Sequence, residues 1–196
     1  MFPAGLSGNR NAMKRLFDIV ASLGGLLLLG WLIAFLVVLV RRDSAGPGLF
    51  RQERVGRNGA PFICLKLRTM RVDTVSAASH DTPASAVTPL GARLRRWKLD
   101  ELPQLWNVLR GEMSFVGPRP CLPIQRELVE ERRRRGVLAL RPGITGLAQV
   151  QGIDMRDPVR LAEIDARYLA TRSFLGDLAL ILRTVAGGGQ GDRVAN

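Results

Sequence analysis

The sequence has very few of the residues that build zinc sites and disulfide frameworks. Its 196 residues include one histidine, His80, and two cysteines, Cys64 and Cys121, which lie far apart and form no C-x-x-C pair. This composition leaves almost no ligands for zinc. We expect both cysteines to be reduced and packed in a domain that faces the cytoplasm, with a disulfide between them as the less favoured alternative.

Acidic residues are also scarce. Asp and Glu number 17 against 29 Lys and Arg, which leaves a net charge of +12, and only three of the basic residues are lysines. Such an excess points to a polyanionic partner, which is a nucleic acid, an anionic membrane surface or a phosphorylated substrate. Arginine is suited to bidentate contacts with phosphate, and the sequence offers it at many places.

Charge is absent from one long stretch, residues 19–40. At ~1.5 Å per residue, a helix of this length covers the hydrocarbon core of a bilayer. A cleaved signal peptide is disfavoured, because the run is too long and no small-residue cleavage site follows it. The sequence therefore predicts a membrane segment.

The basic residues at both ends of this segment bear on its topology in the membrane. Lys14-Arg15 precede it and Arg41-Arg42 follow it, so the tendency of basic residues to stay in the cytoplasm applies to both ends. Gly24, Gly25 and Gly30 lie inside the run, which favours a bent, re-entrant helix, with an ordinary span as the alternative. We expect a disordered lead over residues 1–12, a re-entrant membrane helix over 13–42, one cytoplasmic domain over 43–186 and a flexible tail over 187–196.

A β-hairpin is predicted directly after the membrane segment. Residues 49–55 and 62–69 read as strands joined across residues 56–59, where Asn58-Gly59 is a strong hairpin signal. Ile63, Leu65 and Leu67 share one face of the second strand, which places Lys66 and Arg68 together on the other. These two cations either line a phosphate site or face solvent.

The rest of the domain reads as mainly helical, with an α+β fold class overall. Residues 71–88 are rich in Ser, Ala and Thr and are expected to form a mobile surface loop that leaves His80 solvated. Residues 141–150 are expected to form a shaped loop, and the arginine run 132–135 to face solvent or lipid. The last helix either lies at the membrane interface or packs in the core. Helices are predicted over residues 88–97, 101–110, 124–135, 157–171 and 173–185.

Two adjacent carboxylates, Asp100 and Glu101, stand at the predicted start of the helix over residues 101–110. Acidic residues in a first helical turn are commonly only caps. The helix N-terminus also favours an ionised carboxylate or a bound phosphate. Cations surround the pair, which fits a metal-bound, phosphate-handling centre. These cations are Arg93, Arg95, Arg96, Lys98 and Arg119.

Five motifs in this order resemble the bacterial sugar transferase family, the monotopic phosphoglycosyl transferases. They are KRLFD (14–18), KLRTM (66–70), LDELPQL (99–105), MSFVGPRP (113–120) and RPGITG (141–146). The resemblance covers nearly everything between residues 14 and 184. It is specific because all five motifs occur together and in order.

The resemblance implies transfer of a sugar-1-phosphate from a nucleotide sugar, usually a UDP-sugar, to a polyprenyl (undecaprenyl) phosphate. This is the first membrane step of polysaccharide or glycoconjugate synthesis, at the cytoplasmic face of the bacterial inner membrane. By resemblance, Asp100 is the nucleophile of a covalent phosphosugar intermediate, and Glu101 shares with it the binding of Mg²⁺. The expected phosphate-binding residues are Lys66, Arg95 and Arg119, with Arg141 and with Arg68, the neighbour of Lys66 on its strand face.

The implied partners are the nucleotide sugar, the polyprenyl phosphate and an anionic bilayer surface that amphipathic helices contact. No nucleic acid partner is expected. The oligomeric state stays open, and a homo-oligomer is one of the alternatives. The family's membrane helix often carries a Ser-Pro pair where this sequence has Gly30-Trp31. Here Gly30 and the basic flanks carry the re-entrant prediction. Two other classes of protein are alternatives. One is a non-catalytic membrane-tethered module that binds polyanions, and the other is a soluble phosphotransferase with residues 19–40 in its core.

Overall fold

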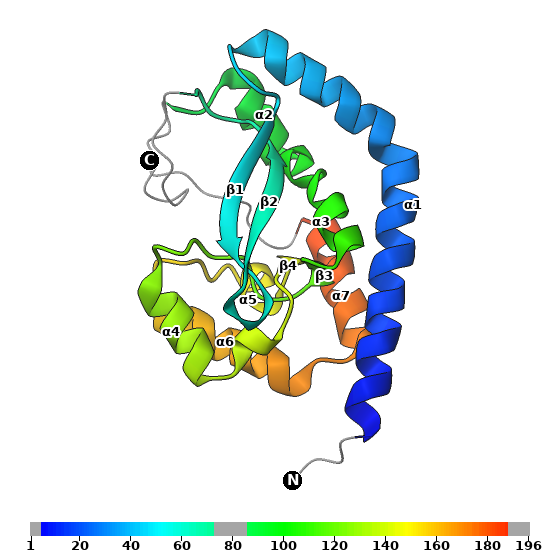
Figure 1. Ribbon diagram of the computed structural model, residues 1–196, viewed down its shortest axis with the longest axis vertical. Coiled ribbons are helices and arrows are strands. Elements are labelled where there is room, and N and C mark those ends of the chain that lie inside the picture. Colours follow the sequence, from blue (N-terminus) through cyan, green and yellow to red (C-terminus); the bar gives the residue numbers. More distant parts are fainter. Residues whose placement is uncertain (1–4, 73–85, 188–196) are drawn as a thin grey trace.

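The computed structural model describes residues 5–72 and 86–187 of the chain. This part is mainly helical, with one long apolar helix at its N-terminal end and two small two-stranded sheets (Figure 1). The predicted fold class is confirmed to that extent. Most of the loop predicted over residues 71–88, with His80, and most of the tail predicted over 187–196 lie outside the described residues.

The first helix, α1, runs without interruption over Gly5–Asp43. Residues 5–12 are therefore helical where the sequence predicted a disordered lead, and residues 1–4 lie outside the description. Its segment Asn11–Asp43 is long and apolar enough to cross a membrane. Figure 1 shows that the helix bends between its two ends. Its large apolar side chains are mostly exposed, Leu27 at 78% and Trp31 at 71%, which disfavours the soluble core helix.

Polar side chains of the KRLFD motif fasten the N-terminal half of α1 to the domain. The buried Asp18 carboxylate accepts hydrogen bonds from Ser114 Oγ and Phe115 N, both at 3.1 Å. Lys14 Nζ lies 2.5 Å from Asp177 Oδ2. Arg15 donates to the carbonyls of Val108 and Leu109, at 2.6 and 2.8 Å, and so satisfies the C-terminal end of another helix. The KRLFD motif therefore anchors α1 to the domain, a structural role that the sequence did not indicate.

The predicted hairpin is confirmed as β1 (Leu49–Val55) and β2 (Pro61–Leu67), paired antiparallel with Arg54 opposite Phe62. Asn58 and Gly59 take positive φ in the connection, as an Asn-Gly turn requires. The predicted alternation holds, and the face opposite Ile63 is turned toward a core cluster. Phe62 and Cys64 pack into a core cluster with Val108 and Met113, while Ile63 is 43% exposed. Because Lys66 shares the face of Phe62 and Cys64, it points inward.

A second, parallel sheet joins β3 (Ser114–Val116) to β4 (Gly143–Thr145). The sequence predicted only a shaped loop over residues 141–150, which in fact contains β4 and the short helix α5 (Leu147–Val150). A Cβ on Gly143 would lie 2.1 Å from the backbone nitrogen of Gly117. The close approach of these two segments therefore requires glycine.

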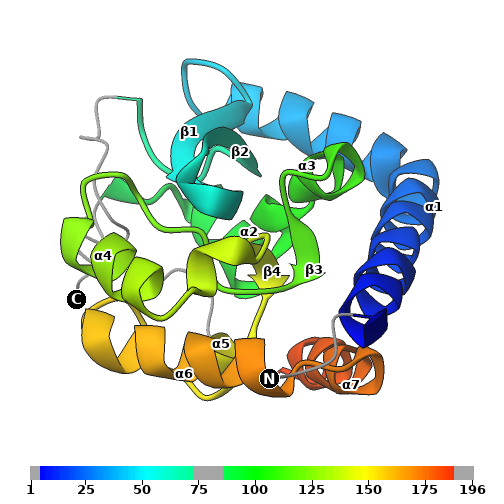
Figure 2. The same ribbon diagram turned by 60° about the horizontal axis from the view of Figure 1, so that its bottom comes forward.

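Three of the predicted helices begin at a side-chain cap. Thr88 caps α2 (Pro89–Arg96), Asp157 caps α6 (Pro158–Thr171) and Ser173 caps α7 (Phe174–Val185), each through a side-chain oxygen. Along α4 (Arg126–Arg134), Glu130 and Glu131 each pair with the arginine four residues further on. Figure 2 shows α7 beside the N-terminal half of α1.

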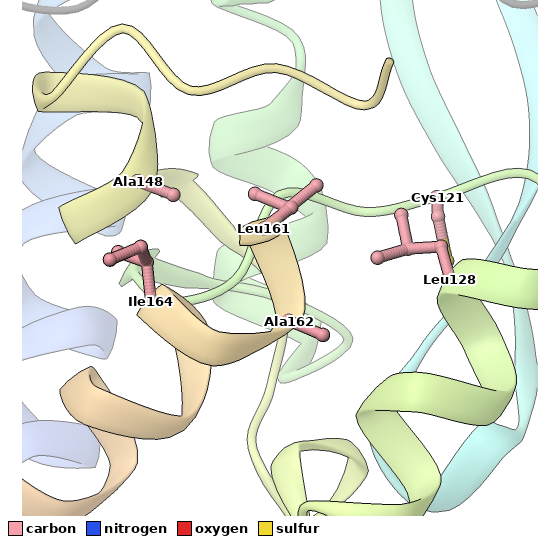
Figure 3. Close-up of a cluster of buried hydrophobic side chains, with 6 residues drawn as sticks. All are labelled: Cys121, Leu128, Ala148, Leu161, Ala162 and Ile164. Carbon is pink, nitrogen blue, oxygen red and sulfur yellow. The ribbon is translucent and has the colours of Figure 1, made fainter. Parts of the chain in front are cut away.

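One core cluster holds α4, α5 and α6 beneath the segment that follows β3 (Figure 3). Cys121 from that segment meets Leu128 of α4 and Leu161 of α6, all at most 2% exposed. Both cysteines are free and buried, as predicted. This cluster matters for the site, because the segment it anchors also carries Arg119.

Candidate functional site

Asp100 and Glu101 lie in a 3-10 turn over Leu99–Glu101 that precedes the next helix, α3 (Gln104–Arg110). The helix predicted over residues 101–110 begins later, at Gln104, so the two carboxylates precede it, and Pro103 occupies the cap position without a side-chain cap bond. The cause is Lys98, whose φ of 56° ends the preceding helical path and starts the tight turn. Helices often end with a residue in this left-handed region, but it is uncommon for a lysine.

Glu101 contacts two of the other predicted site residues. Its Oε1 lies 3.2 Å from Lys66 Nζ and 3.2 Å from Arg119 Nη2, and all three side chains are largely buried. Asp100, the next residue in the turn, is only 5% exposed. A buried carboxylate needs such cationic partners. The structure therefore gathers two adjacent carboxylates and two cations within one turn, one strand and one loop.

The position of Arg119 depends on a buried ion pair that the sequence reading missed. Arg132 of α4 donates through Nε and Nη2 to Asp165 Oδ2 of α6, at 3.0 and 2.7 Å, and through Nη1 to the carbonyl of Arg119 at 2.8 Å. Both side chains of the pair are less than 5% exposed. Arg132 was assigned to a solvated or lipid-facing run, which is wrong. In the sequence, Arg132 cannot be distinguished from the arginines beside it. Its partner, Asp165, lies on another helix, and the sequence alone does not show that the two meet.

A second missed residue ties the hairpin to the same loop. Arg54 of β1 donates to the carbonyl of Pro120 at 3.0 Å and to Gln52 Oε1 at 2.6 Å. The backbone nitrogen of Val55 adds a bond to the carbonyl of Cys121 at 2.9 Å. Gln52 and Arg54 share a face of β1, so their period-two spacing was a usable sequence signal.

The other predicted phosphate-binding residues lie in different surroundings. Arg95 donates from Nε to Thr69 Oγ1 at 2.9 Å, which fastens α2 to the segment after β2. Arg68 does not share a face with Lys66 in a phosphate site. Its buried guanidinium donates to the carbonyls of Val40, Ser44 and Ala45 and holds the C-terminal end of α1. Arg141 donates from Nε to the carbonyl of Gly111 at 2.8 Å and borders another pocket.

A cavity of about 540 Å³ opens beside Glu101. Its wall combines charged side chains, Arg119 and Lys98 with Glu101, and apolar ones. The apolar part includes Trp97, Leu102, Leu105, Phe115 and Ile144. This mixed wall suits a ligand that joins a phosphate to an apolar chain.

Asp100 and Glu101 are the two carboxylates that this turn offers to a metal ion. Within residues 5–72 and 86–187 there is no group of three or more His, Cys, Asp or Glu residues that could hold a metal ion. Mg²⁺ is commonly held by one or two carboxylates together with substrate phosphates and water. Asp100 and Glu101 fit that requirement, and they do not fit a closed all-protein cage.

Cys64 lies close behind the charged cluster. Burial raises the pKa of its thiol, and the nearby Lys66, Arg54 and Arg119 only partly offset that effect. A thiol with a raised pKa stays protonated near neutral pH and is a poor nucleophile. Cys64 therefore serves as packing under the site.

Comparison with known proteins agrees with the motifs. A sequence model of the family described as bacterial sugar transferase matches residues 9–189. The chain is 42% identical over 184 residues to the UDP-glucose:undecaprenyl-phosphate glucose-1-phosphate transferase of Caulobacter vibrioides, covering 88% of this chain and 68% of that protein. It is 41% identical over 182 residues to the exopolysaccharide production protein PSS of Rhizobium leguminosarum, covering 87% and 88%. With the galactosyl transferase CpsE of Streptococcus agalactiae the identity is 37% over 188 residues, covering 88% and 41%.

Proposed function

Because the chain belongs to the bacterial sugar transferase family, we propose that it transfers a sugar-1-phosphate from a nucleotide sugar, in the first instance a UDP-sugar, to undecaprenyl phosphate. The observation that carries the proposal is the cluster of Lys66, Asp100, Glu101 and Arg119 beside the mixed cavity. Two relatives are named for steps of this kind, one with UDP-glucose and undecaprenyl phosphate and one with UDP-galactose and a lipid carrier.

The reaction runs as two displacements at one phosphorus. In the first, an oxygen of the Asp100 carboxylate attacks the phosphorus that carries the sugar, and the bond from this phosphorus to the nucleoside monophosphate breaks. An aspartyl phosphosugar remains on the chain. In the second, an oxygen of undecaprenyl phosphate attacks the same phosphorus, the acyl–phosphate bond breaks and the carboxylate returns. A covalent intermediate divides one difficult transfer into two easier ones.

The cluster supplies the charge that these steps need. A carboxylate approaches a diphosphate only when the negative charges are neutralised. Lys66 and Arg119 are placed to contact phosphate oxygens next to the turn, and Glu101 holds both cations in position. Asp100 and Glu101 would hold Mg²⁺, which when bound adds further neutralisation of phosphate charge.

The lipid acceptor requires the site to lie close to a bilayer. Apolar side chains exposed on α1, on the turn before the site and on α7 provide a surface for it. Among them Trp31 is 71% exposed, Trp97 70% and Leu175 77%. We place the domain at the cytoplasmic face of the inner membrane, with this surface toward the lipid.

We further propose that α1 is re-entrant, so that both of its ends lie in the cytoplasm. The basic flanks at both ends support this topology, and so does the bend visible in Figure 1. In intact Gram-negative cells, Asn11→Cys and Asp43→Cys should both resist an impermeant maleimide and react after permeabilisation. Native Cys64 and Cys121 are buried and give a low background. Labelling of Asn11→Cys alone in intact cells would contradict the re-entrant path and establish a span.

The function is tested with the detergent-purified full chain, undecaprenyl phosphate, Mg²⁺ and a panel of nucleotide sugars. We expect release of nucleoside monophosphate with a subset of the sugars and only when the acceptor lipid is present for more than one turnover. A non-catalytic polyanion-binding module would bind nucleotide sugars or lipid without any release. That outcome with every sugar would overturn the proposal.

A further inference from the structure

A second pocket, of about 270 Å³, lies on the opposite side of β3 from the candidate site. Ser114 and Val116 line this pocket, whereas Phe115 between them lines the larger cavity beside Glu101. Successive residues of a strand point to opposite faces, so the strand separates the two spaces. The smaller pocket is therefore not part of the reaction cavity.

Its wall carries a strong excess of positive charge. The charged lining residues are Lys14, Arg15, Arg57, Arg141, Arg172 and Asp18. Lys14 pairs with Asp177, and Asp18 is bonded by Ser114 and Phe115. In the described part of the chain, the four arginines have no carboxylate partner within 4.0 Å, in contrast to Arg133, Arg134 and Arg135.

Two of these arginines are held in a way that leaves hydrogen-bonding capacity. Arg57 donates from Nε to the carbonyl of Ala139 at 3.0 Å, and Arg141 donates from Nε to the carbonyl of Gly111 at 2.8 Å. Neither uses its Nη atoms on an acceptor within residues 5–72 and 86–187. A guanidinium anchored at Nε keeps its planar donor groups for a carboxylate or a phosphate.

Arg141 shows the effect of the like charges around it. Burial lowers the pKa of the Arg141 guanidinium, Arg57 and Arg15 lower it further, and Asp18 opposes them. Close cations without counter-charge raise the free energy of the folded chain. A bound anion would relieve this repulsion.

We propose that this pocket binds a phosphate-bearing anion, either free in solution or as the headgroup of an anionic lipid. The volume is below that of pockets that enclose a drug-sized molecule, so a small phosphate group fits and a whole nucleotide sugar does not. Lys14 stands on α1 just before its exposed Leu16 and Val20, which brings the pocket to the polar edge of the apolar helix surface. This inference does not depend on the proposed reaction.

The test uses the full chain and the double variant Arg57→Gln/Arg172→Gln, which removes one exposed and one partly buried cation of the pocket. The matched control is Arg51→Gln/Arg126→Gln, two exposed arginines outside it. One arm measures binding of inorganic pyrophosphate in detergent without metal. The other measures the shift in thermal unfolding between nanodiscs of phosphatidylcholine and nanodiscs that contain phosphatidic acid. Lys66→Met serves as a further control, since it removes a cation that pairs with Glu101 in the candidate site and does not line this pocket.

We expect the pocket variant to lose about tenfold in pyrophosphate affinity, to lose the phosphatidic acid shift, or both, while the two controls keep these responses. Loss in one arm only identifies the free or the lipid-borne phosphate as the ligand. If the pocket variant keeps both responses, or if the Lys66→Met or surface control loses them equally, the site does not exist. Nucleoside monophosphate release, measured in the same samples, reports separately on the proposed function.

Discussion

Asp100→Asn is expected to reduce release of nucleoside monophosphate by at least about a thousandfold, because it replaces the attacking carboxylate by an amide of the same shape. The chain should remain folded and membrane-bound, since the substitution preserves volume and changes no element of the fold. Asp154→Asn is the matched control, because that carboxylate is largely exposed and its ion pair with Arg156 is long, at 3.8 Å. The control should keep wild-type release.

The comparison also separates the enzyme from the binding module. If Asp100 were only a structural acid, Asp100→Asn would behave as Asp154→Asn does. Near-normal release from folded Asp100→Asn would show that Asp100 is not the nucleophile. Circular dichroism and membrane sedimentation of both variants show whether the loss is chemical or structural.

Arg132→Met is expected to lower the free energy of unfolding by about 3–5 kcal/mol, because it leaves the Asp165 carboxylate buried without its partner. The pair joins α4 to α6, and Arg132 also holds the carbonyl of Arg119. The exposed Arg134→Met on the same helix should change stability by less than about 0.5 kcal/mol. Chemical denaturation of the detergent-solubilised chain gives both values.

The pH dependence of this effect has a defined sign. Burial raises the pKa of Asp165 above its ordinary value of 3.8, although Arg132 opposes the shift. For an acid with a raised pKa in the folded state, stability is fully present below 3.8 and is lost as pH rises through the folded pKa. Removing Arg132 raises that pKa further, so the destabilisation should be larger at pH 8 than at pH 5. Arg132→Met/Asp165→Leu should recover most of the stability and lose this pH dependence; a double variant as weak as the single one would contradict the ion-pair explanation.

Local signals in the sequence were sufficient for a good part of this fold. The caps at Thr88, Asp157 and Ser173 and the Asn58-Gly59 turn depend on residues within a few positions of each other. The apolar run over residues 19–40 likewise predicts its own helix. These features were correct because short-range hydrogen bonds and backbone preferences decide them.

Features that depend on distant partners were not predictable in the same way. The pairing of β4 with β3 requires two glycines from separate motifs to meet. Arg68 and Arg132 look like surface cations until the carbonyls at the end of α1 and the carboxylate of Asp165 are placed beside them. The sequence left open which face of β2 turns inward because both of its faces carry apolar residues, and packing against Val108 and Met113 decides it.

The candidate site shows the same division. The motifs were sufficient to single out Asp100, Glu101, Lys66 and Arg119, and the structure brings Glu101 together with both cations. The turn that presents them was not visible, because Leu102, Leu105 and Leu109 keep a helical period through it. A left-handed Lys98 has no sequence signature, since the local preference of lysine is against that backbone.

The most direct test of the account is the intact mass of the full chain after incubation with its nucleotide sugar and Mg²⁺ in the absence of undecaprenyl phosphate. We expect one sugar phosphate to be added per chain, located at Asp100 by peptide mapping, with at most one nucleoside monophosphate released. Undecaprenyl phosphate added afterwards should remove the adduct, and Asp100→Asn should never form it. An unmodified chain that releases nucleoside monophosphate only when the lipid is present would contradict the covalent intermediate and indicate direct transfer.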